Sequence, residues 1–350
     1  MNTRFYRTQK IKASLAIIGA GVFLATFYPF INGETIGSIL NGFVIGLVGS
    51  IFIALNEIIL NFKTIRRMRF WAVVVYKTIL YVTFFTISIP LIVSIGRSLQ
   101  AGINLQTFVQ QGGLHHFLFE EDFHIIMAYS LFSTLIFIFT YQMSKKMGQG
   151  VFFSFVFGKY HRPRERELIF MFLDLNKSTT IAEKMGDMKF NNLLKDFFLD
   201  ITDSILMHGG NIYRYVGDEV VVSWSMNKGI DNARVIRTFF HAQEAVLENK
   251  QNYLDKYGLF PTFTASFDYG KVVVGEIGNI KSQISFFGNV LYETAEIEKQ
   301  CANCKSELLI ADRLLNKIKL PDGLLPKKVG VIETSLGSKI EISSVLKKTA

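Results

Sequence analysis

Two apolar stretches, each carrying one aspartate, decide the fold of the second half of the chain. The first reads Leu168-Ile-Phe-Met-Phe-Leu-Asp174-Leu-Asn-Lys-Ser178-Thr179, and the second reads Asn211-Ile-Tyr-Arg214-Tyr-Val-Gly217-Asp218-Glu219-Val-Val-Val-Ser-Trp224. Short runs rich in β-branched and aromatic residues predict strands. Each predicted strand has its aspartate at one end, so pairing the two strands would bring two carboxylates together that are distant in sequence.

The segment between these strands has apolar residues at helical spacing, and Gly209-Gly210 follows it. The apolar positions are Phe190, Leu193, Leu194, Phe197, Phe198, Ile201 and Ile205. The unit is therefore predicted to be strand, helix, strand.

Strands and helices continue to alternate after this unit. The predicted elements are a helix at Asn232–Lys256 ended by Gly258, a strand at Pro261–Phe267 with a turn at Gly270, a strand at Gln283–Phe287, a helix at Asn289–Ala302, a strand at Leu308–Ile310, a helix at Asp312–Ile318 and a hairpin across Leu336-Gly337. Strands mixed with helices in this way indicate an α+β sheet domain.

The first half of the chain is predicted to cross a membrane. The 350 residues are 49% hydrophobic, with the apolar excess before residue 145. A helix needs about 20 apolar residues to span the hydrocarbon core. Four stretches reach that length: Ala13–Ile31, Ile36–Leu60, Phe70–Ile95 and His124–Met143. The predicted domains are therefore a four-span domain at 1–143, a cytoplasmic linker at 144–166 and a catalytic-type domain at 167–350.

Clusters of basic residues flank the spans on one side. They are Arg4, Arg7, Lys10 and Lys12 before the first span, Lys63, Arg66, Arg67 and Arg69 between the second and third, and Lys145 and Lys146 after the fourth. The positive-inside rule then puts both termini in the cytoplasm and the Arg97–Asp122 loop outside. An integral protein of the plasma (inner) membrane is expected, with lipid as a partner. Glu57 and Lys77 lie near span ends and are expected to extend toward the cytoplasmic side.

The remaining polar features favour no separate site. The net charge of +9 comes from basic residues beside the spans, so no nucleic-acid partner is expected. Cys301 and Cys304 form a single Cys-x-x-Cys, which is weak evidence for zinc. The outer loop holds His115, His116 and His124 without a defined ligand spacing, and a solvated loop is the simpler interpretation.

The two aspartates suit a divalent cation on a triphosphate. Magnesium prefers hard oxygen ligands and is usually bound by one or two carboxylates together with phosphate oxygens. Paired metals would neutralise charge on the attacked phosphorus and on the leaving group.

The ordered motifs of residues 165–345 resemble the catalytic domain of class III nucleotidyl cyclases. The matching pieces are Phe172-Leu-Asp174-Leu-Asn-Lys-Ser178-Thr179, Tyr215-Val-Gly217-Asp218-Glu219, Asp268-Tyr-Gly270 with Gly275 and Ile277-Gly278, and Phe287-Gly288-Asn-Val-Leu-Tyr292-Glu-Thr-Ala295-Glu296-Ile-Glu. The resemblance, to the membrane-anchored bacterial type, implies a ferredoxin-like α+β catalytic domain behind the four transmembrane helices.

The resemblance also implies a reaction and a site. A nucleoside triphosphate, ATP first, would be converted to a 3′,5′-cyclic nucleotide and pyrophosphate for intracellular signalling. The site would be shared by two head-to-tail protomers, in a homodimer or in a heterodimer with another cyclase subunit. Asp174 and Asp218, with Leu175, would hold two Mg²⁺ or Mn²⁺ ions. The residues implied to bind nucleotide are Leu175, Asn176, Ser178, Thr179, Arg214, Gly217, Ser285 and Lys339.

The complementary half of that site departs from the family's pattern. Arg214 stands where a purine-reading Lys is usual, and Ser285 where its Asp or Thr partner stands. Tyr292 and Glu296 occupy the places of the catalytic Asn and Arg on the last helix. Losing one such donor commonly costs about 10²–10³ in rate.

Two alternatives therefore stay open. One is a catalytically impaired pseudo-cyclase that acts as a membrane receptor or regulatory subunit. The other is a diguanylate cyclase, because Arg214-Tyr-Val-Gly217-Asp218-Glu219-Val resembles the Gly-Gly-Asp-Glu-Phe hairpin of that family, with Val216 in place of its first glycine.

Overall fold

The chain folds into two compact units. The computed structural model describes residues 3–59, 68–121, 123–147, 151–280, 282–335 and 337–348. One unit comprises Arg7–Met147, and the other includes Gly148–Ala350. Each unit is described by itself.

The first unit contains four long helices at the places where the sequence predicts spans. They are α1 (Thr3–Ile31), α2 (Ile36–Ile59), α4 (Phe70–Gln100) and α7 (Phe123–Met147). All four are long and apolar enough to cross a membrane. The last two are longer than predicted, since α4 continues to Gln100 and α7 to Met147. The basic residues Lys63, Arg66 and Arg67, on which part of the orientation argument depends, lie outside the described residues.

Glu57 and Lys77 differ from the expectation that they extend toward the cytoplasmic side. Their side chains form an ion pair between α2 and α4 and are only 5% and 4% exposed. A buried charge is tolerated when a partner of opposite charge satisfies it. Pairing within the helix bundle therefore replaces extension toward solvent.

The polar segments around the spans are more ordered than predicted. The expected outer loop contains α5 (Leu105–Gln110) and α6 (Gly113–Phe119), and the expected linker contains α8 (Val151–Val156). Histidines of the outer loop pair locally, because His116 Nδ1 lies 2.9 Å from Glu120 Oε2. Asp122, at the end of that loop, lies outside the described residues.

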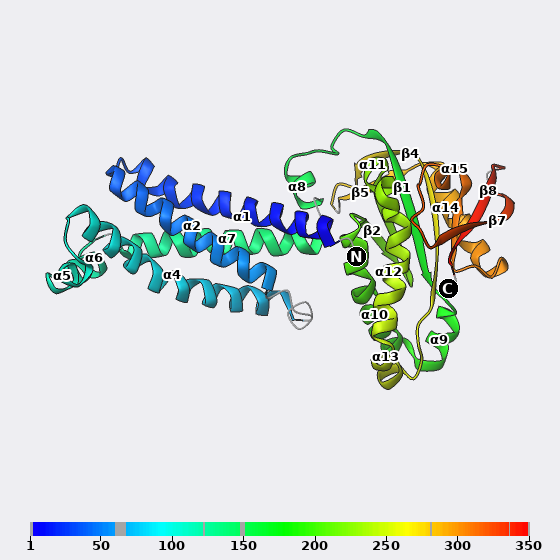
Figure 1. The fold of residues 1–350 in the computed structure, drawn as a ribbon, viewed down its shortest axis with the longest axis horizontal. Coiled ribbons are helices and arrows are strands. Elements are labelled where there is room, and N and C mark those ends of the chain that lie inside the picture. The colour runs from blue at the N-terminus through cyan, green and yellow to red at the C-terminus, as the bar shows by residue number, and fades with distance from the viewer. Residues whose placement is uncertain are drawn as a thin grey trace. The chain divides into compact units, whose positions relative to one another are not determined.

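The second unit is built on one mixed sheet in the order β2-β3-β1-β4-β6-β8-β7, with β5 also paired to β4 (Figure 1). The strands are β1 (Arg164–Leu175), β2 (Asn211–Val216), β3 (Glu219–Ser225), β4 (Phe263–Ile277), β5 (Gln283–Phe287), β6 (Leu308–Ala311), β7 (Leu324–Glu333) and β8 (Lys339–Lys347). The helices are α9 (Ser178–Met185), α10 (Asp187–Met207), α11 (Met226–Ile230), α12 (Arg234–Glu248), α13 (Lys250–Tyr257), α14 (Asn289–Asn303) and α15 (Asp312–Leu315), and a 3₁₀ turn spans Asp231–Ala233.

Alternation along β1 gives the sheet two buried faces. Ile169, Met171 and Leu173 pack against α10 and α12. Phe170 and Phe172 point the other way and pack near Val290 of α14. Successive side chains of a strand point to opposite faces, so β1, paired on both edges, is covered by helices on both sides.

The predicted strand–helix–strand unit is confirmed, with β1, α10 and the β2–β3 hairpin in its places. Leu173 pairs with Val220, so β1 lies directly beside β3. α10 ends at Met207, and Gly209 follows with a positive φ of 75°, which a glycine adopts without strain.

The turn predicted at Gly270 is wrong. β4 runs unbroken from Phe263 to Ile277, and Gly270 pairs with Leu168 in its middle. A Cβ added at Gly270 would lie 2.9 Å from the Cβ of Val290. Gly270 is therefore required by the close approach of α14 to the sheet, and the turn comes only after Ile277.

Two further predicted boundaries shift. The helix predicted at Asn232–Lys256 is two helices, α12 and α13, which meet at Asn249 and stop at Gly258. The predicted C-terminal hairpin is formed by β7 and β8, although Leu336 in its turn lies outside the described residues.

Candidate active site

The two aspartates meet at one end of the strands β1, β2 and β3. Asp174 is the penultimate residue of β1 and pairs with Thr264 of β4. Asp218 lies in the two-residue turn between β2 and β3, where Val216 pairs with Glu219. Gly217 occupies this turn with a φ of 63°. A positive φ at the first residue of a two-residue hairpin turn favours glycine, so Gly217 shapes the turn that presents Asp218.

The electrostatics of the pair are unfavourable without a cation. Burial, the charge of Asp218 and a hydrogen bond with Asp218 raise the pKa of Asp174 to about 8. Burial and the nearby Glu298 raise the pKa of Glu219 to about 7, while Arg214 opposes that rise. Carboxylates that share a half-buried site repel one another when all are ionised. A bound divalent cation would offset this repulsion.

Glu298 is a member of the acidic cluster that the sequence-based prediction missed. It lies on α14, accepts a hydrogen bond from Thr264 Oγ1 at 3.0 Å, and has a pKa raised by burial and by Asp218. Thr264 is also the β4 partner of Asp174, so its hydrogen bond to Glu298 connects α14 to the strand ends that carry the aspartates. The sequence offered one signal, because Glu298 is the last residue of the family-like motif that begins at Phe287 and forms α14.

The loop after Asp174 leads directly into a short helix. Lys177 has a positive φ of 56° and precedes α9, which begins at Ser178. Asn176 is held by main-chain and side-chain bonds to Thr262, at 2.9 and 3.1 Å. The first amides of a helix have no internal acceptors, so the turn beginning with Ser178 and Thr179 presents donors beside the acids.

Leu175 can contribute only its main chain to this end of the strands. Its side chain is 1% exposed and lies in the core beneath α10 and α12. Its β4 partner is Phe263.

Arg214 lies on the hairpin that carries Asp218. It pairs with Val221, and its guanidinium stacks over the Tyr213 ring at 5.2 Å. The Tyr213 ring in turn lies 4.5 Å from Phe286 of β5. Arg214 thus lies between the acid turn and the strand that carries Ser285.

Ser285 lies far from the acids within one chain. It pairs with Gly275, whereas Asp174 pairs with Thr264, and these two positions are eleven residues apart along β4. Ser285 therefore lies beside the last part of β4, whereas Asp174 lies beside its beginning. Ser285 is also largely buried, at 6% exposed.

Tyr292, Glu296 and Lys339 form a second cluster near the β7–β8 turn. Tyr292 is 66% exposed, and Glu296, one helical turn later, accepts a hydrogen bond from Ser335 Oγ at 2.9 Å. Lys339 begins β8 four residues after Ser335 and is exposed. Of the predicted site residues, Ser285 is thus placed away from the acid pair along β4, whereas Glu296 shares α14 with Glu298 of the acidic cluster.

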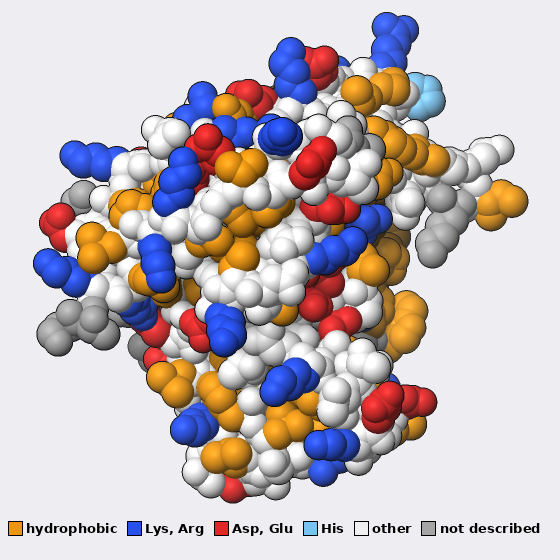
Figure 2. Space-filling view, turned by 90° about the vertical axis from the view of Figure 1, so that its right-hand side faces the viewer, with side chains coloured by type: hydrophobic (Ala, Val, Ile, Leu, Met, Phe, Trp, Pro, Cys, Tyr) orange, Lys and Arg blue, Asp and Glu red, His pale blue; other side chains and the backbone are white. Residues whose placement is uncertain are grey.

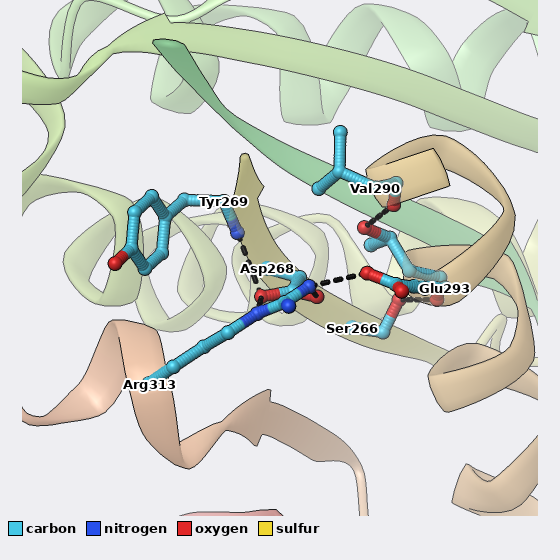
Figure 3. Close-up of polar contacts among 7 residues, drawn as sticks. Ser266, Asp268, Tyr269, Val290, Glu293 and Arg313 are labelled. Carbon is cyan, nitrogen blue, oxygen red and sulfur yellow. Dashed lines mark hydrogen bonds and ion pairs between the residues drawn. The ribbon is translucent and has the colours of Figure 1, made fainter. Parts of the chain in front are cut away.

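An ionic network with two buried carboxylates joins α14 to the sheet, and it was also missed from the sequence. Figure 3 shows Arg313 of α15 reaching between Asp268 of β4 and Glu293 of α14. Arg313 Nε donates to Asp268 Oδ1 at 2.8 Å, and Asp268 is completely buried. Three separate elements supply these charges, so only the tertiary fold brings them together.

Other candidate ligands of the sequence stay apart. Among the residues that the structure describes, no three His, Cys, Asp or Glu side chains form a metal-binding group. Cys301 is buried with its Sγ 3.8 Å from the Ala265 carbonyl oxygen, and both cysteines are free. On the face of the second unit in Figure 2, basic and acidic side chains are interspersed.

Known proteins resemble up to about two thirds of this chain in sequence or in fold. No family model matches the chain. It is 30% identical over 221 residues to a protein named Adenylate cyclase 2 from Rhizobium meliloti (strain 1021), covering 63% of this chain and 61% of the relative's length. A bacterial light-regulated adenylyl cyclase structure matches with a TM-score of 0.53 and 20% identity, covering 65% of this chain and 66% of that one. The adenylyl cyclase CyaB from P. aeruginosa matches with a TM-score of 0.45 and 18% identity, over 54% of this chain and 97% of that one.

Fold, motif order and sequence similarity agree. The resemblance to class III nucleotidyl cyclases is therefore confirmed, and the chain combines four helices long and apolar enough to span a membrane with an α+β domain that has the fold of a class III cyclase catalytic domain.

Proposed function

We propose that this protein is a membrane-anchored nucleotidyl cyclase that converts a nucleoside triphosphate, ATP first, to a 3′,5′-cyclic nucleotide and pyrophosphate. The observation that carries the proposal is the meeting of Asp174 and Asp218 beside the first turn of α9. The name of the Rhizobium meliloti relative supports ATP as the first substrate to test.

The donor set fits Mg²⁺ or Mn²⁺. Two carboxylates and the Leu175 main chain offer hard oxygens, and the raised pKa of Asp174 reflects negative charge that lacks a counterion. Bound there, two metal ions would lower the pKa of the ribose 3′-hydroxyl and neutralise charge on the α-phosphate and pyrophosphate. Asn176, Ser178 and Thr179, with the free amides of α9, would orient the phosphates. Thr262 holds Asn176 in position for this role.

A head-to-tail dimer would complete the site. Because Ser285 pairs with Gly275, eleven residues along β4 from the partner of Asp174, the complementary residues would come from a second chain. Exposed Tyr292 and Lys339 and the half-exposed Glu296 would then face the triphosphate across the interface. Arg214 and Ser285 would contact the base. Four spans with cytoplasmic termini would put this site in the cytoplasm.

The principal test is a turnover assay on the full chain. Purified protein in nanodiscs would be incubated with each of ATP, GTP, CTP and UTP and with Mg²⁺ or Mn²⁺, and products would be identified by mass spectrometry. The proposal predicts a cyclic mononucleotide that disappears in Asp174→Ala. Unreacted substrate in all eight incubations would contradict it, and a cyclic dinucleotide would identify a diguanylate cyclase instead.

A second candidate function is a catalytically impaired receptor or regulatory subunit that pairs with an active cyclase chain. Glu296 favours it, because the resemblance assigns this position to a cation that stabilises charge on the phosphorus, and the carboxylate here accepts a hydrogen bond from Ser335. The variant Tyr292→Asn/Glu296→Arg separates the two functions. An impaired subunit should gain at least 10²-fold in rate when these donors are supplied. Equal rates for the variant and the wild type would rule the impaired subunit out.

A further inference from the structure

A cavity lies inside the first unit, among the four long helices. It has a volume of 160 Å³ and is lined by residues from all four. Most of its lining is apolar, with Ile17 from α1, Ile53 from α2, Phe85 from α4 and Phe137 from α7. An apolar cavity of about 150 Å³ is large enough to hold a benzene-sized molecule.

Four residues of α7 with hydroxyl groups line this cavity: Tyr129, Ser130, Ser133 and Thr134. Tyr129 donates to the Leu24 carbonyl at 2.8 Å. Ser133 and Thr134 are neighbours in the chain, and Thr134 is 6% exposed. Neither hydroxyl has a hydrogen bond to any described residue. By contrast, Thr86 of α4 donates to the Val82 carbonyl at 2.8 Å, the usual solution for a hydroxyl in an apolar helix. Ser133 is half-buried and Thr134 is buried, so a polar group bound in the cavity would supply the hydrogen-bond partner that the Thr134 hydroxyl lacks.

The charges at the cavity indicate an uncharged ligand. Arg97 lines it, but its guanidinium already binds both carboxylate oxygens of Glu121, at 2.9 and 2.6 Å. Glu34 lines the same cavity and would repel an anion. An ammonium group would in turn meet the Arg97 guanidinium.

We propose that this cavity binds a small neutral amphiphile, with an apolar body of about six to ten carbon atoms and one hydroxyl or carbonyl group. The body lies among Ile17, Ile53 and Phe137. The polar group hydrogen-bonds to the hydroxyls of Ser133 and Thr134. This inference depends on the first unit alone and holds whether or not the second unit turns over nucleotide.

The test uses 3-azi-1-octanol, a photoactivatable eight-carbon alcohol, with the full chain in nanodiscs. Labelled residues are mapped by mass spectrometry after illumination, with and without excess 1-octanol. We expect saturable labelling of α7 around Ser130–Phe137 that 1-octanol removes and that octanoate at equal concentration leaves in place.

Matched variants separate recognition from partition into lipid. Thr134→Val keeps the side-chain shape and should lower labelling of the α7 segment about tenfold. Ser133→Ala serves the same purpose if Thr134→Val does not fold. Thr86→Val is the control, because Thr86 is exposed and its hydroxyl is already satisfied. It should leave labelling unchanged.

Three outcomes would overturn the proposal. Labelling that does not saturate and spreads over the exposed faces of all four helices would mean that bilayer lipid fills the cavity. Equal labelling of Thr134→Val, Ser133→Ala and wild type would mean that the hydroxyls recognise nothing. Equal competition by octanoate would contradict the preference for a neutral ligand.

Discussion

Replacing Asp174 by asparagine should stabilise the second unit at alkaline pH when metal is absent. Burial and Asp218 raise the pKa of Asp174 to about 8 from an ordinary value of 3.8. The folded state therefore keeps a proton that the unfolded chain releases. Stability is then greatest below about pH 4 and falls as the pH rises to about 8. An asparagine side chain cannot ionise, so the variant escapes this loss.

The size of the effect follows from the shift. One pKa unit corresponds to about 1.4 kcal/mol, which sets a ceiling of about 6 kcal/mol. Asp174 is only half-buried, and screening by solvent reduces the expected gain to about 2 kcal/mol at pH 8.5. The difference between variant and wild type should shrink toward zero near pH 4.

The chain offers a clean probe for this measurement. It has two tryptophans, Trp71 and Trp224, and Trp224 is completely buried in the core of the second unit. In a Trp71→Phe background, urea titrations of the full chain in EDTA, followed by tryptophan fluorescence, report unfolding of that unit. Glu248→Gln, a change at an exposed carboxylate at the end of α12, is the control.

The result would refute the reasoning if Asp174→Asn were no more stable than wild type at pH 8.5, or if its gain did not depend on pH. Excess Mg²⁺ supplies a second comparison. It should stabilise the wild type, because a cation relieves the same repulsion. It should have a smaller effect on Asp174→Asn.

Two packing predictions use the same urea assay. Arg313→Met leaves the buried Asp268 without its cation and should lower the free energy of unfolding by about 3 kcal/mol, while Arg313→Lys should lose less; no loss with Met would contradict the role of the network. Gly270→Ala should cost about 1–3 kcal/mol, because the new Cβ lies 2.9 Å from the Val290 Cβ. Gly275→Ala, whose Cβ would meet Pro163 at 3.4 Å, should cost less, and equal losses would show that close helix packing is not the cause.

The positions of Asp174 and Asp218 were predictable because their signals are local. Alternation along β1 places its apolar residues on two faces, and Gly217 marks the turn that carries Asp218. Neither signal depends on distant parts of the chain. The four apolar stretches were predictable for the same reason, since length and composition alone suffice for a membrane helix.

Gly270 shows where local signals mislead. The sequence-based prediction interpreted this glycine as a turn, although an isolated glycine within a strand can also mark the close approach of another element. Its small size is needed by Val290, twenty residues later. Glu57 and Lys77 are a similar case, because each charge is explained only by its partner on another helix.

Strand period and turn chemistry act over a few residues, so the amino-acid sequence was enough to identify which residues could hold metal and phosphate. Which charged side chains lie close together was decided by the tertiary structure. The packing of α14 on the sheet brought Glu298 to the acid pair, and α15 joined Arg313 to Asp268. Strand register put Ser285 and Asp174 beside positions of β4 that are eleven residues apart. Coulomb interactions and burial depend on distance in space, so the raised pKa of Asp174 became visible only in the tertiary structure.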